Sequence, residues 1–330
     1  MVLRNDFLCG DRNMDVVALG ELLIDFATRT VNGDGYPTME ANPGGAPANF
    51  LAALARFGMK TALLGKVGDD AFGKMLIKTL DQAGIETKGI VVDPKWFTTL
   101  AFVTFDESGD RSFSFARKPG ADTQLAFEEL DLHLIDEAKV FHFGSLSLTD
   151  EASRMTTYRA VAYAKSRNKL ITYDPNLRKP LWNDLDECRK QLLWGLAQAD
   201  IVKISDEEVE FLLGMNVEAG ARYILENYNV KLVFVTCGAD GCFFKNAIAE
   251  GKIPALTGIK VIDTTGAGDI FGGSAVWKIL QQDKAPEALT KEELVDIVQF
   301  ACTSAGLSTT GSGGISSVPC YESVLQRMAQ

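Results

Sequence analysis

The chain has 330 residues, of which 46% are hydrophobic and 23% are charged, a composition typical of a globular protein with a large core. Its formal net charge of −11 disfavours nucleic acids and anionic membranes as partners, and no run approaches the ~18–20 apolar residues of a membrane-spanning helix. The six cysteines form no C-x-x-C pair and fit free thiols in a reducing, cytoplasmic compartment.

Short apolar runs alternate with helical patterns along most of the chain, while residues 1–14 are expected to form a disordered extension. The strands are predicted at Val16–Leu19, Thr61–Val67, Val140–Phe143, Leu170–Tyr173, Ile201–Ile204 and Leu232–Thr236. The helices are predicted at Ala48–Phe57, Phe72–Gln82, Ser153–Arg167, Cys188–Ala197, Asp206–Leu213 and Ala219–Asn227. This alternation predicts an α/β fold whose mainly parallel sheet carries helices on both faces.

Residues 90–118 interrupt this rhythm, because they show no helical pattern. Successive strands are predicted at Ile90–Val92, Leu100–Phe105 and Ser112–Phe115, with a hairpin turn at residues 107–110. Residues 26–40 also look extended. The two segments are predicted to form a small second sheet, which is either a lid over the carboxyl ends of the main sheet or an edge hairpin without a catalytic role.

The stretch Asp263-Thr-Thr-Gly-Ala-Gly-Asp269 is a small-residue turn that leads into a helix with Phe271, Ala275 and Ile279 on one face. A strand is expected before it, around Lys260–Ile262. Backbone N–H groups at a helix start attract phosphate oxygens, and Asp269 could take the proton of a hydroxyl that attacks phosphorus. The turn could also be a tight connection whose acidic residue complements the helix dipole.

Two standard nucleotide-binding motifs are absent from the sequence. No Gly-x-x-x-x-Gly-Lys-Ser/Thr occurs, which excludes a Walker-type P-loop. Phe271 stands where the dinucleotide fingerprint needs its third glycine, so a dehydrogenase is disfavoured.

Further polar clusters follow the ends of predicted strands, where parallel sheets bind ligands. Asp25 could hold a diol, and Gly44-Gly-Ala-Pro-Ala-Asn49 lets a ligand approach the backbone. Arg178 could clamp a phosphate, although a surface ion pair would also explain it. The remaining candidates are Lys203 and Glu208, with Glu208 as a Mg²⁺ ligand through water, and a glycine-rich shelf for adenosine at Thr236, Gly238 and Gly241.

The segments Gly44–Asn49 and Asp263–Asp269 resemble, in order and separation, the two signatures of the ribokinase-like sugar kinases, the PfkB family. The resemblance covers about residues 15–320. Thr98–Phe102, Asp174–Arg178 and Lys203–Glu208 look most like fructokinases. The family resemblance implies a Rossmann-like α/β domain over residues 15–330 with a small β lid. It also implies ATP-dependent phosphorylation of a primary sugar hydroxyl and dimers that form through the lid.

The resemblance also implies roles for single residues. Asp269 would be the base, with the N–H groups of Gly266, Ala267 and Gly268 as an anion hole and Arg178 near the phosphates. Asp25, Gly45 and Asn49 match family positions that hold the sugar, and Gly44 and Phe102 are further candidates for it. The candidates for holding the nucleotide are Lys203, Glu208, Thr236, Gly238, Gly241 and Gly268. The family's monovalent-cation loop, a K⁺ site, would correspond to Asp263, Thr265, Gly313 and Ser317. The chain departs from the family at Ser205, where Asn is common.

Three functions remain open from the sequence. The first is an ATP- and Mg²⁺-dependent fructokinase. The second is a kinase for another acceptor: 2-keto-3-deoxygluconate, with Arg111, Arg117 or Lys118 as its counter-ion, or a nucleoside stacked on Phe102, Phe113 or Phe115. The third is a non-catalytic sugar sensor, which the intact segment Gly266–Asp269 argues against.

Overall fold

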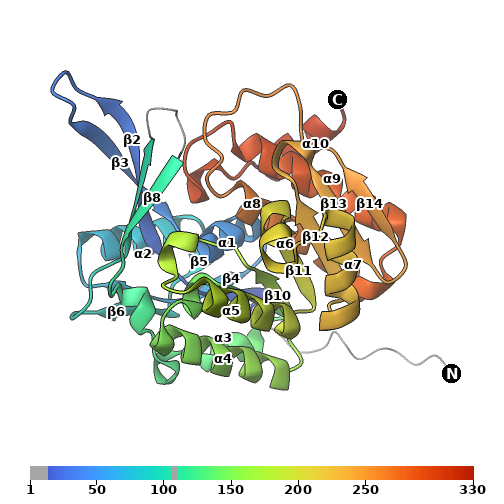
Figure 1. Cartoon of the computed structure of the whole chain (residues 1–330), viewed down its shortest axis with the longest axis horizontal. Coiled ribbons are helices and arrows are strands. Elements are labelled where there is room, and N and C mark those ends of the chain that lie inside the picture. Colours follow the sequence, from blue (N-terminus) through green and yellow to red (C-terminus); the bar gives the residue numbers. More distant parts are fainter. Residues whose placement is uncertain (1–13, 106–110) are drawn as a thin grey trace.

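In the computed structural model, which describes residues 14–105 and 111–330, a large sheet runs through the centre of the molecule (Figure 1). The order of its strands is β14-β13-β12-β11-β10-β9-β1-β4-β5, and β6 pairs with β4 away from this path. All pairs from β12 through β11, β10, β9, β1 and β4 to β5, and the pair of β4 with β6, are parallel. Strands β13 and β14 form an antiparallel edge beside β12. The bounds are β1 Val16–Leu19, β4 Thr61–Gly68, β5 Ile85–Glu86, β6 Ile90–Asp93, β9 Val140–Gly144, β10 Leu170–Asp174, β11 Ile201–Ser205, β12 Leu232–Thr236, β13 Cys242–Asn246 and β14 Glu250–Ile253.

Helices cover both faces of this sheet, as the apolar strands require. One face carries α1 Ala46–Arg56, α2 Ala71–Gln82, α8 Ala267–Leu280 and α9 Lys291–Ser308, with α10 Tyr321–Met328 packed against α9. The other face carries α3 Leu132–Glu137, α4 Glu151–Ser166, α5 Leu185–Gln198, α6 Asp206–Leu213 and α7 Val217–Tyr228. Short 3₁₀ turns are η1 Ala121–Gln124, η2 Phe127–Glu129, η3 Leu146–Leu148, η4 Lys179–Leu181, η5 Gly238–Asp240, η6 Pro286–Ala288 and η7 Ile315–Ser317.

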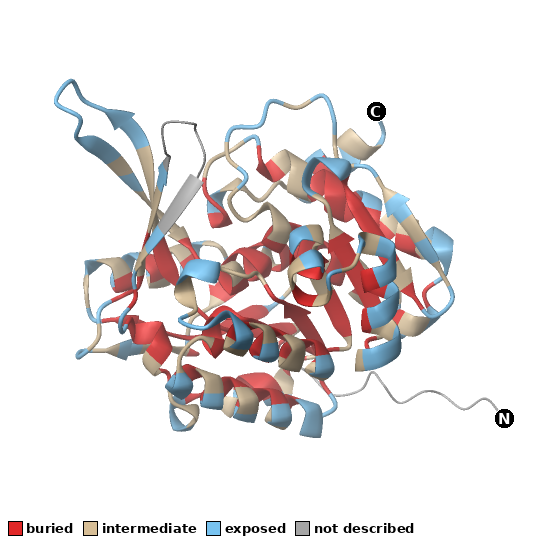
Figure 2. Cartoon of the chain, viewed as in Figure 1, coloured by how far each residue is buried: buried red, intermediate tan, exposed pale blue. Residues whose placement is uncertain are grey.

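Strand β1 shows why near-continuous apolar runs specify this arrangement. Val17 and Leu19 belong to the core under α4 and α5, while Val16 and Ala18 belong to the core under α1 and α2. Successive side chains of a strand point to opposite faces, so a strand buried on both faces must be apolar throughout. Figure 2 shows the result as a buried layer between helices whose outer surfaces are exposed.

A second, smaller sheet projects from the body (Figure 1). It has the order β3-β2-β7-β8, with β2 Leu23–Val31, β3 Pro37–Gly44, β7 Leu100–Phe105 and β8 Arg111–Ala116. The last three residues of β2 are exposed, whereas its first two are buried. The predicted α/β class, with a mainly parallel sheet, helices on both faces and a small second sheet, is therefore confirmed.

Several predicted boundaries differ from the structure. Ile90–Val92 lies in β6 and pairs with Gly65–Val67 of β4, so it extends the main sheet and does not belong to the small one. The expected strand at Lys260–Ile262 is wrong: the segment has no strand partner, Val261 and Ile262 are exposed, and the Ile262 N–H donates to the carbonyl of Thr309. Met14, counted in the terminal extension, is buried in the core. The rest of that extension and the predicted hairpin turn at 107–110 lie outside the described residues.

The C-terminal third holds elements that the sequence analysis did not predict: the antiparallel edge, α9 and α10. Helix α9 starts with a capping box in which Thr290 Oγ1 accepts the Glu293 N–H and Glu293 accepts the Thr290 N–H. The spacing Thr290-x-x-Glu293 ahead of an apolar run was a usable signal for this start. Within residues 14–105 and 111–330, no helix combines the length and apolar character needed to cross a membrane.

Candidate active site

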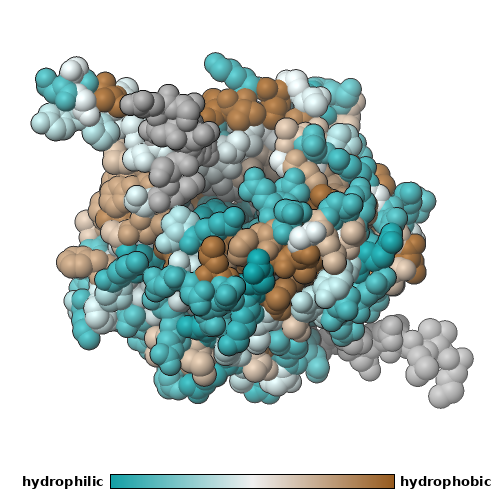
Figure 3. All heavy atoms as spheres, viewed as in Figure 1, coloured by the Kyte–Doolittle hydropathy of each residue, from teal (hydrophilic) through white to brown (hydrophobic). Residues whose placement is uncertain are grey.

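A cavity of about 730 Å³ opens where the carboxyl ends of the parallel strands face the small sheet. Residues from β2, α1, β11 and α8 line it, and Val103 and Phe115 of the small sheet form part of its wall. Figure 3 shows a largely hydrophilic surface on this side of the molecule, with apolar side chains at the top of the view and near its centre. The small sheet therefore contributes directly to the cavity.

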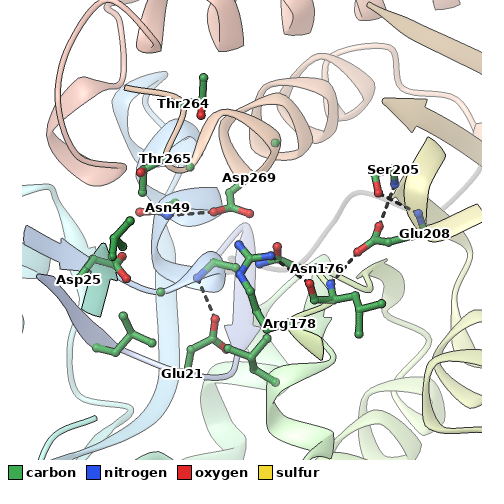
Figure 4. Close-up of a pocket in the computed structure, with 18 of the residues that line it drawn as sticks. Glu21, Asp25, Asn49, Asn176, Arg178, Ser205, Glu208, Thr264, Thr265 and Asp269 are labelled. Atoms are coloured by element: carbon green, nitrogen blue, oxygen red, sulfur yellow. Dashed lines mark hydrogen bonds between the residues drawn. The ribbon is translucent and has the colours of Figure 1, made fainter. Parts of the chain in front are cut away.

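Asp269 lies in the first turn of α8 and points into the cavity (Figure 4). Its side chain is only 9% exposed, and its Oδ2 accepts a hydrogen bond of 2.9 Å from Nδ2 of Asn49. Burial raises the pKa of Asp269, and the positive charge of Lys203 opposes this rise. A buried carboxylate with a raised pKa beside an open cavity is suited to accept a proton.

The start of α8 depends on glycine. Gly266 has φ +77°, and a Cβ there would lie 2.8 Å from Cα of Gly314 and 3.0 Å from Nδ2 of Asn49. Gly266 and Gly268 both line the cavity, whereas Ala267 does not, and the Ala267 N–H donates to the carbonyl of Thr264 at 3.3 Å. The anion-binding surface predicted from residues 266–268 is thus brought to the cavity, with Ala267 set back from it.

Asp25 lies opposite Asp269 near the start of β2 (Figure 4). Gly44, paired through β3, leaves room for it: a Cβ on Gly44 would lie 2.3 Å from Oδ2 of Asp25. Burial raises the pKa of Asp25 to about 6; Arg178 opposes this rise, and Asp269 adds to it. Gly44 does not line the cavity, but its lack of a side chain leaves room for the carboxylate of Asp25.

The loop before α1 is tightly packed against the end of β1. Gly45, the N-cap of α1, has φ +116°, and a Cβ there would lie 2.4 Å from the carbonyl oxygen of Glu21. Oε1 of Glu21 accepts the N–H of Ala46 at 2.9 Å. Asn49 follows in the first turn of α1, 2% exposed, and its Oδ1 has no hydrogen-bond partner within the part of the chain that the structure describes.

Glu21 is a cavity residue that the sequence analysis missed. Its side chain is 3% exposed, and burial raises its pKa to about 7. The available signal was its position directly after a predicted strand, where Gly20-Glu21 meets the carboxyl edge of the sheet. A buried acidic residue at such an edge marks a candidate functional residue.

Lys203 supplies a buried positive charge on the other side of Asp269. Its Nζ lies 3.0 and 3.2 Å from the carboxylate oxygens of Asp174. Burial alone would lower the pKa of Lys203, but the charges of Asp174, Glu208 and Asp269 raise it. A Cβ on Gly268 would lie 2.9 Å from Nζ, so the ammonium group sits directly beside the first turn of α8.

Glu208 and Ser205 form the N-terminal capping box of α6 at the far end of the cavity (Figure 4). Oε2 of Glu208 accepts the Ser205 N–H at 2.8 Å, and Oε1 accepts the Leu177 N–H at 2.6 Å. Ser205 stands where the family commonly has Asn, and its Oγ accepts a hydrogen bond from the Glu208 N–H. Arg178 and Asn176 lie between this end and Asp269, and Asn176 adopts φ +44°.

No described group of three or more His, Cys, Asp or Glu side chains could hold a metal by itself. A metal at this cavity would take most of its ligands from water and from a bound substrate, with Glu208 and Glu207 on the wall. This coordination is typical of Mg²⁺.

The predicted cation residues are brought together in two adjacent loops. Oδ1 of Asp263 accepts the N–H and the hydroxyl of Thr265 at 2.9 and 2.7 Å, and Oδ2 accepts the N–H of Gly313 at 3.1 Å. Ser317 donates to the carbonyl of Gly314 at 3.2 Å. The carboxylate of Asp263 thus ties the two loops together.

Other predicted residues lie away from this cavity. Phe102 faces the opposite side of the small sheet, where its ring stacks on Phe26 at 5.4 Å. The shelf residues Thr236, Gly238 and Gly241 do not line the cavity. Gly241 instead serves the turn into β13, since a Cβ there would lie 2.0 Å from the carbonyl oxygen of Ile253. The side chains of Arg111 and Phe113, named as alternatives for other acceptors, lie outside the described residues.

Comparisons with known proteins agree with this site. The model of the pfkB family carbohydrate kinases matches residues 13–320. Fructokinase-1 of Zea mays is 42% identical, covering 94% of this chain and 96% of its own length, and Fructokinase-2 of Solanum lycopersicum is 40% identical, covering 94% of each. Fructokinase from Xylella fastidiosa with bound ATP superposes with a TM-score of 0.88 at 30% identity, covering 96% of this chain and 98% of its own. Fructokinase from Vibrio cholerae O395 with fructose, ADP and calcium ion superposes with a TM-score of 0.84 at 29% identity, covering 96% of this chain and 100% of its own.

Proposed function

The chain belongs to the pfkB family of carbohydrate kinases, and we propose that it transfers the γ-phosphate of ATP to a primary hydroxyl of fructose. One observation carries the proposal: the Asp269 carboxylate is buried at the start of α8 and held by Asn49 beside an open cavity. A pure sugar sensor would need no such base.

The geometry supports an in-line transfer in which Asp269 accepts the proton of the attacking hydroxyl. Asp25 and Asn49, which both line the cavity, would hold and orient the sugar. The N–H groups at the start of α8, together with Arg178 and Lys203, would stabilise negative charge on the transferred group. Mg²⁺, placed by Glu208 through water, would neutralise charge on the ATP phosphates when bound.

The small sheet would act as the lid of this site. Its strands β7 and β8 already contribute Val103 and Phe115 to the cavity wall. Closure over a bound sugar would exclude water and suppress ATP hydrolysis.

The exposed tip of the small sheet is the proposed surface for a homodimer. Val31 is 61% exposed and Tyr36 is 71% exposed on the β2–β3 hairpin, which projects from the body (Figure 1). Apolar side chains on a projecting edge favour pairing with another edge. Size-exclusion chromatography with light scattering tests this: Val31→Lys with Tyr36→Lys is expected to convert a dimer into a monomer, and a wild-type monomer at micromolar concentration would contradict it.

A coupled assay of ADP release tests the activity. Fructose, ribose, 2-keto-3-deoxygluconate and adenosine are compared as acceptors with MgATP, and fructose is expected to give the highest kcat/KM. Asp269→Asn is expected to lower kcat by about 10²–10⁴ because it removes the base. Asp296→Asn is the matched control. Asp296 is a half-exposed carboxylate of α9 that pairs with Lys278 of α8, the helix that also carries Asp269. Sugar binding without sugar-dependent ADP release would establish the sensor instead.

A further inference from the structure

The acidic side chain of Glu21 forms part of the cavity wall, and a buried ion pair, Arg117–Asp122, lies outside the cavity. Glu21 and Leu146 both line the cavity. Arg117 does not line it, and its Nη2 donates to the Leu146 carbonyl at 2.9 Å. The charge of Arg117 acts on Glu21, so the two groups are neighbours across this wall.

Asp122 holds Arg117 in this position. The Arg117 guanidinium is buried, and its Nε and Nη2 lie 2.8 and 2.7 Å from Oδ2 of Asp122. Its Nη1 donates to Oγ1 of Thr149 at 2.7 Å. The second oxygen of Asp122 accepts the hydroxyl of Thr99, so the pair is fastened to residues that precede β7 and follow β8. Arg117 is therefore occupied outside the cavity.

We propose that Glu21 and the Arg117–Asp122 pair together select an uncharged sugar as the acceptor: Glu21 accepts a hydrogen bond from a sugar hydroxyl, and Asp122 withholds Arg117 from the cavity, where it would otherwise bind a sugar acid. The inference rests on the proposed fructokinase activity and adds the charge class of its acceptor. Glu21 acts as a specificity residue, and Asp122 acts through Arg117 as a positioning residue.

The charges around the proposed sugar position support this selection. Glu21, Asp25 and Asp269 all present carboxylates to this end of the cavity. Lys203 and Arg178 oppose the rise that burial causes in the pKa of Asp269, and Arg178 opposes the corresponding rise for Asp25, so these cations already face carboxylates of the protein. Carboxylates accept hydrogen bonds from hydroxyl groups and repel another carboxylate in the same pocket. A polyol fits this end, and a sugar acid does not.

Glu21→Gln separates this role from a purely structural one. The glutamine Oε1 can still accept the N–H of Ala46, so the cap of α1 is kept while the negative charge is removed. The KM for fructose is expected to rise about tenfold, as for loss of a charge-assisted hydrogen bond, with the KM for ATP unchanged. The ratio of kcat/KM for fructose over 2-keto-3-deoxygluconate is expected to fall by about tenfold or more. Glu293→Gln, a capping glutamate of α9 remote from the cavity, is the matched control.

Asp122→Asn is the second variant, because it keeps the shape of the side chain while freeing Arg117 to pair with Glu21. This variant is expected to lower the ratio of kcat/KM for fructose over 2-keto-3-deoxygluconate. The double variant Glu21→Gln, Asp122→Asn is expected to give the lowest ratio of all. A Glu21→Gln enzyme with the wild-type fructose KM and the wild-type ratio would overturn the proposal and leave Glu21 as a cap only. Failure of the fructokinase proposal would look different, since the wild-type enzyme would then not turn over fructose.

Discussion

A single methyl group at Gly314, a residue that does not line the cavity, should impair catalysis by displacing Asn49. Gly314 has φ −73° and ψ −62°, a backbone conformation open to alanine. A Cβ there, however, would lie 2.1 Å from Oδ1 and 2.4 Å from Cγ of Asn49. Asn49 is 2% exposed and its Nδ2 holds Asp269, so its amide cannot move aside without disturbing that hydrogen bond.

The size of the effect follows from this geometry. Ordinary van der Waals contact requires about 3.5 Å or more, so Asn49 or the loop around Gly314 must shift by more than about 1 Å. A displacement of this size near reacting groups costs up to about 10²-fold in rate. Forcing an extra methyl into a packed site costs about 1–3 kcal/mol of stability. Gly314→Ala is therefore expected to lower kcat for fructose by about 10–10²-fold and to lower the unfolding temperature.

The assay is steady-state ADP release with fructose, accompanied by thermal unfolding of the same preparations. Gly272→Ala in α8 is the matched control, since a Cβ there would make ordinary contact with the ring of Phe50 at 3.5 Å. This control should keep the wild-type kcat and gain about 0.5–1 kcal/mol from the better helix former. If Gly314→Ala retains the wild-type kcat and unfolding temperature, the assigned packing of Asn49 against residues 311–317 is incorrect.

Three further predictions concern the packing, the charges and the loops around the cavity. Gly273→Ala, whose Cβ would lie 2.4 Å from the carbonyl oxygen of Phe50, should separate α1 from α8 and lower the free energy of unfolding by about 1–3 kcal/mol in denaturant melts; an unchanged midpoint would contradict the close packing of these helices. Burial in the folded state raises the pKa of Glu21 from 4.5 to about 7. Between these pH values the folded state binds more protons than the unfolded chain, so the free energy of unfolding falls as pH rises, by at most about 3 kcal/mol. The unfolding temperature of Glu21→Gln minus that of the wild type should accordingly grow from pH 4.5 to pH 7, and a difference independent of pH would refute the burial of that charge. Turnover should be higher in K⁺ than in a bulky organic cation at equal ionic strength, because a cation held by the loops tied through Asp263 would order the start of α8; equal rates in both salts would exclude such a site.

The acceptor end of the cavity shows where reasoning from the sequence stopped. The pairing of Gly44–Asn49 with Asp263–Asp269 was readable, and the structure brings Asn49 within 2.9 Å of Asp269. Phe102 was assigned to the sugar, but it faces Phe26 on the far side of the small sheet. Alternation along a strand predicts that neighbouring residues point to opposite faces, and it does not say which face borders the cavity. Arg117 was a candidate counter-ion for a sugar acid until the structure showed it bound to Asp122.

The sequence by itself determined the class of the fold and the chemistry of the main site, because both are encoded in short segments. Apolar runs of strand length, helical stripes and the glycines before α8 act locally, within one element or one turn. Only the tertiary structure decided the place of Glu21 in the cavity, the packing of Gly314 on Asn49 and the pairing that withholds Arg117. These contacts join residues far apart in the chain, and their outcome depends on how helices and sheets pack, which no local pattern records.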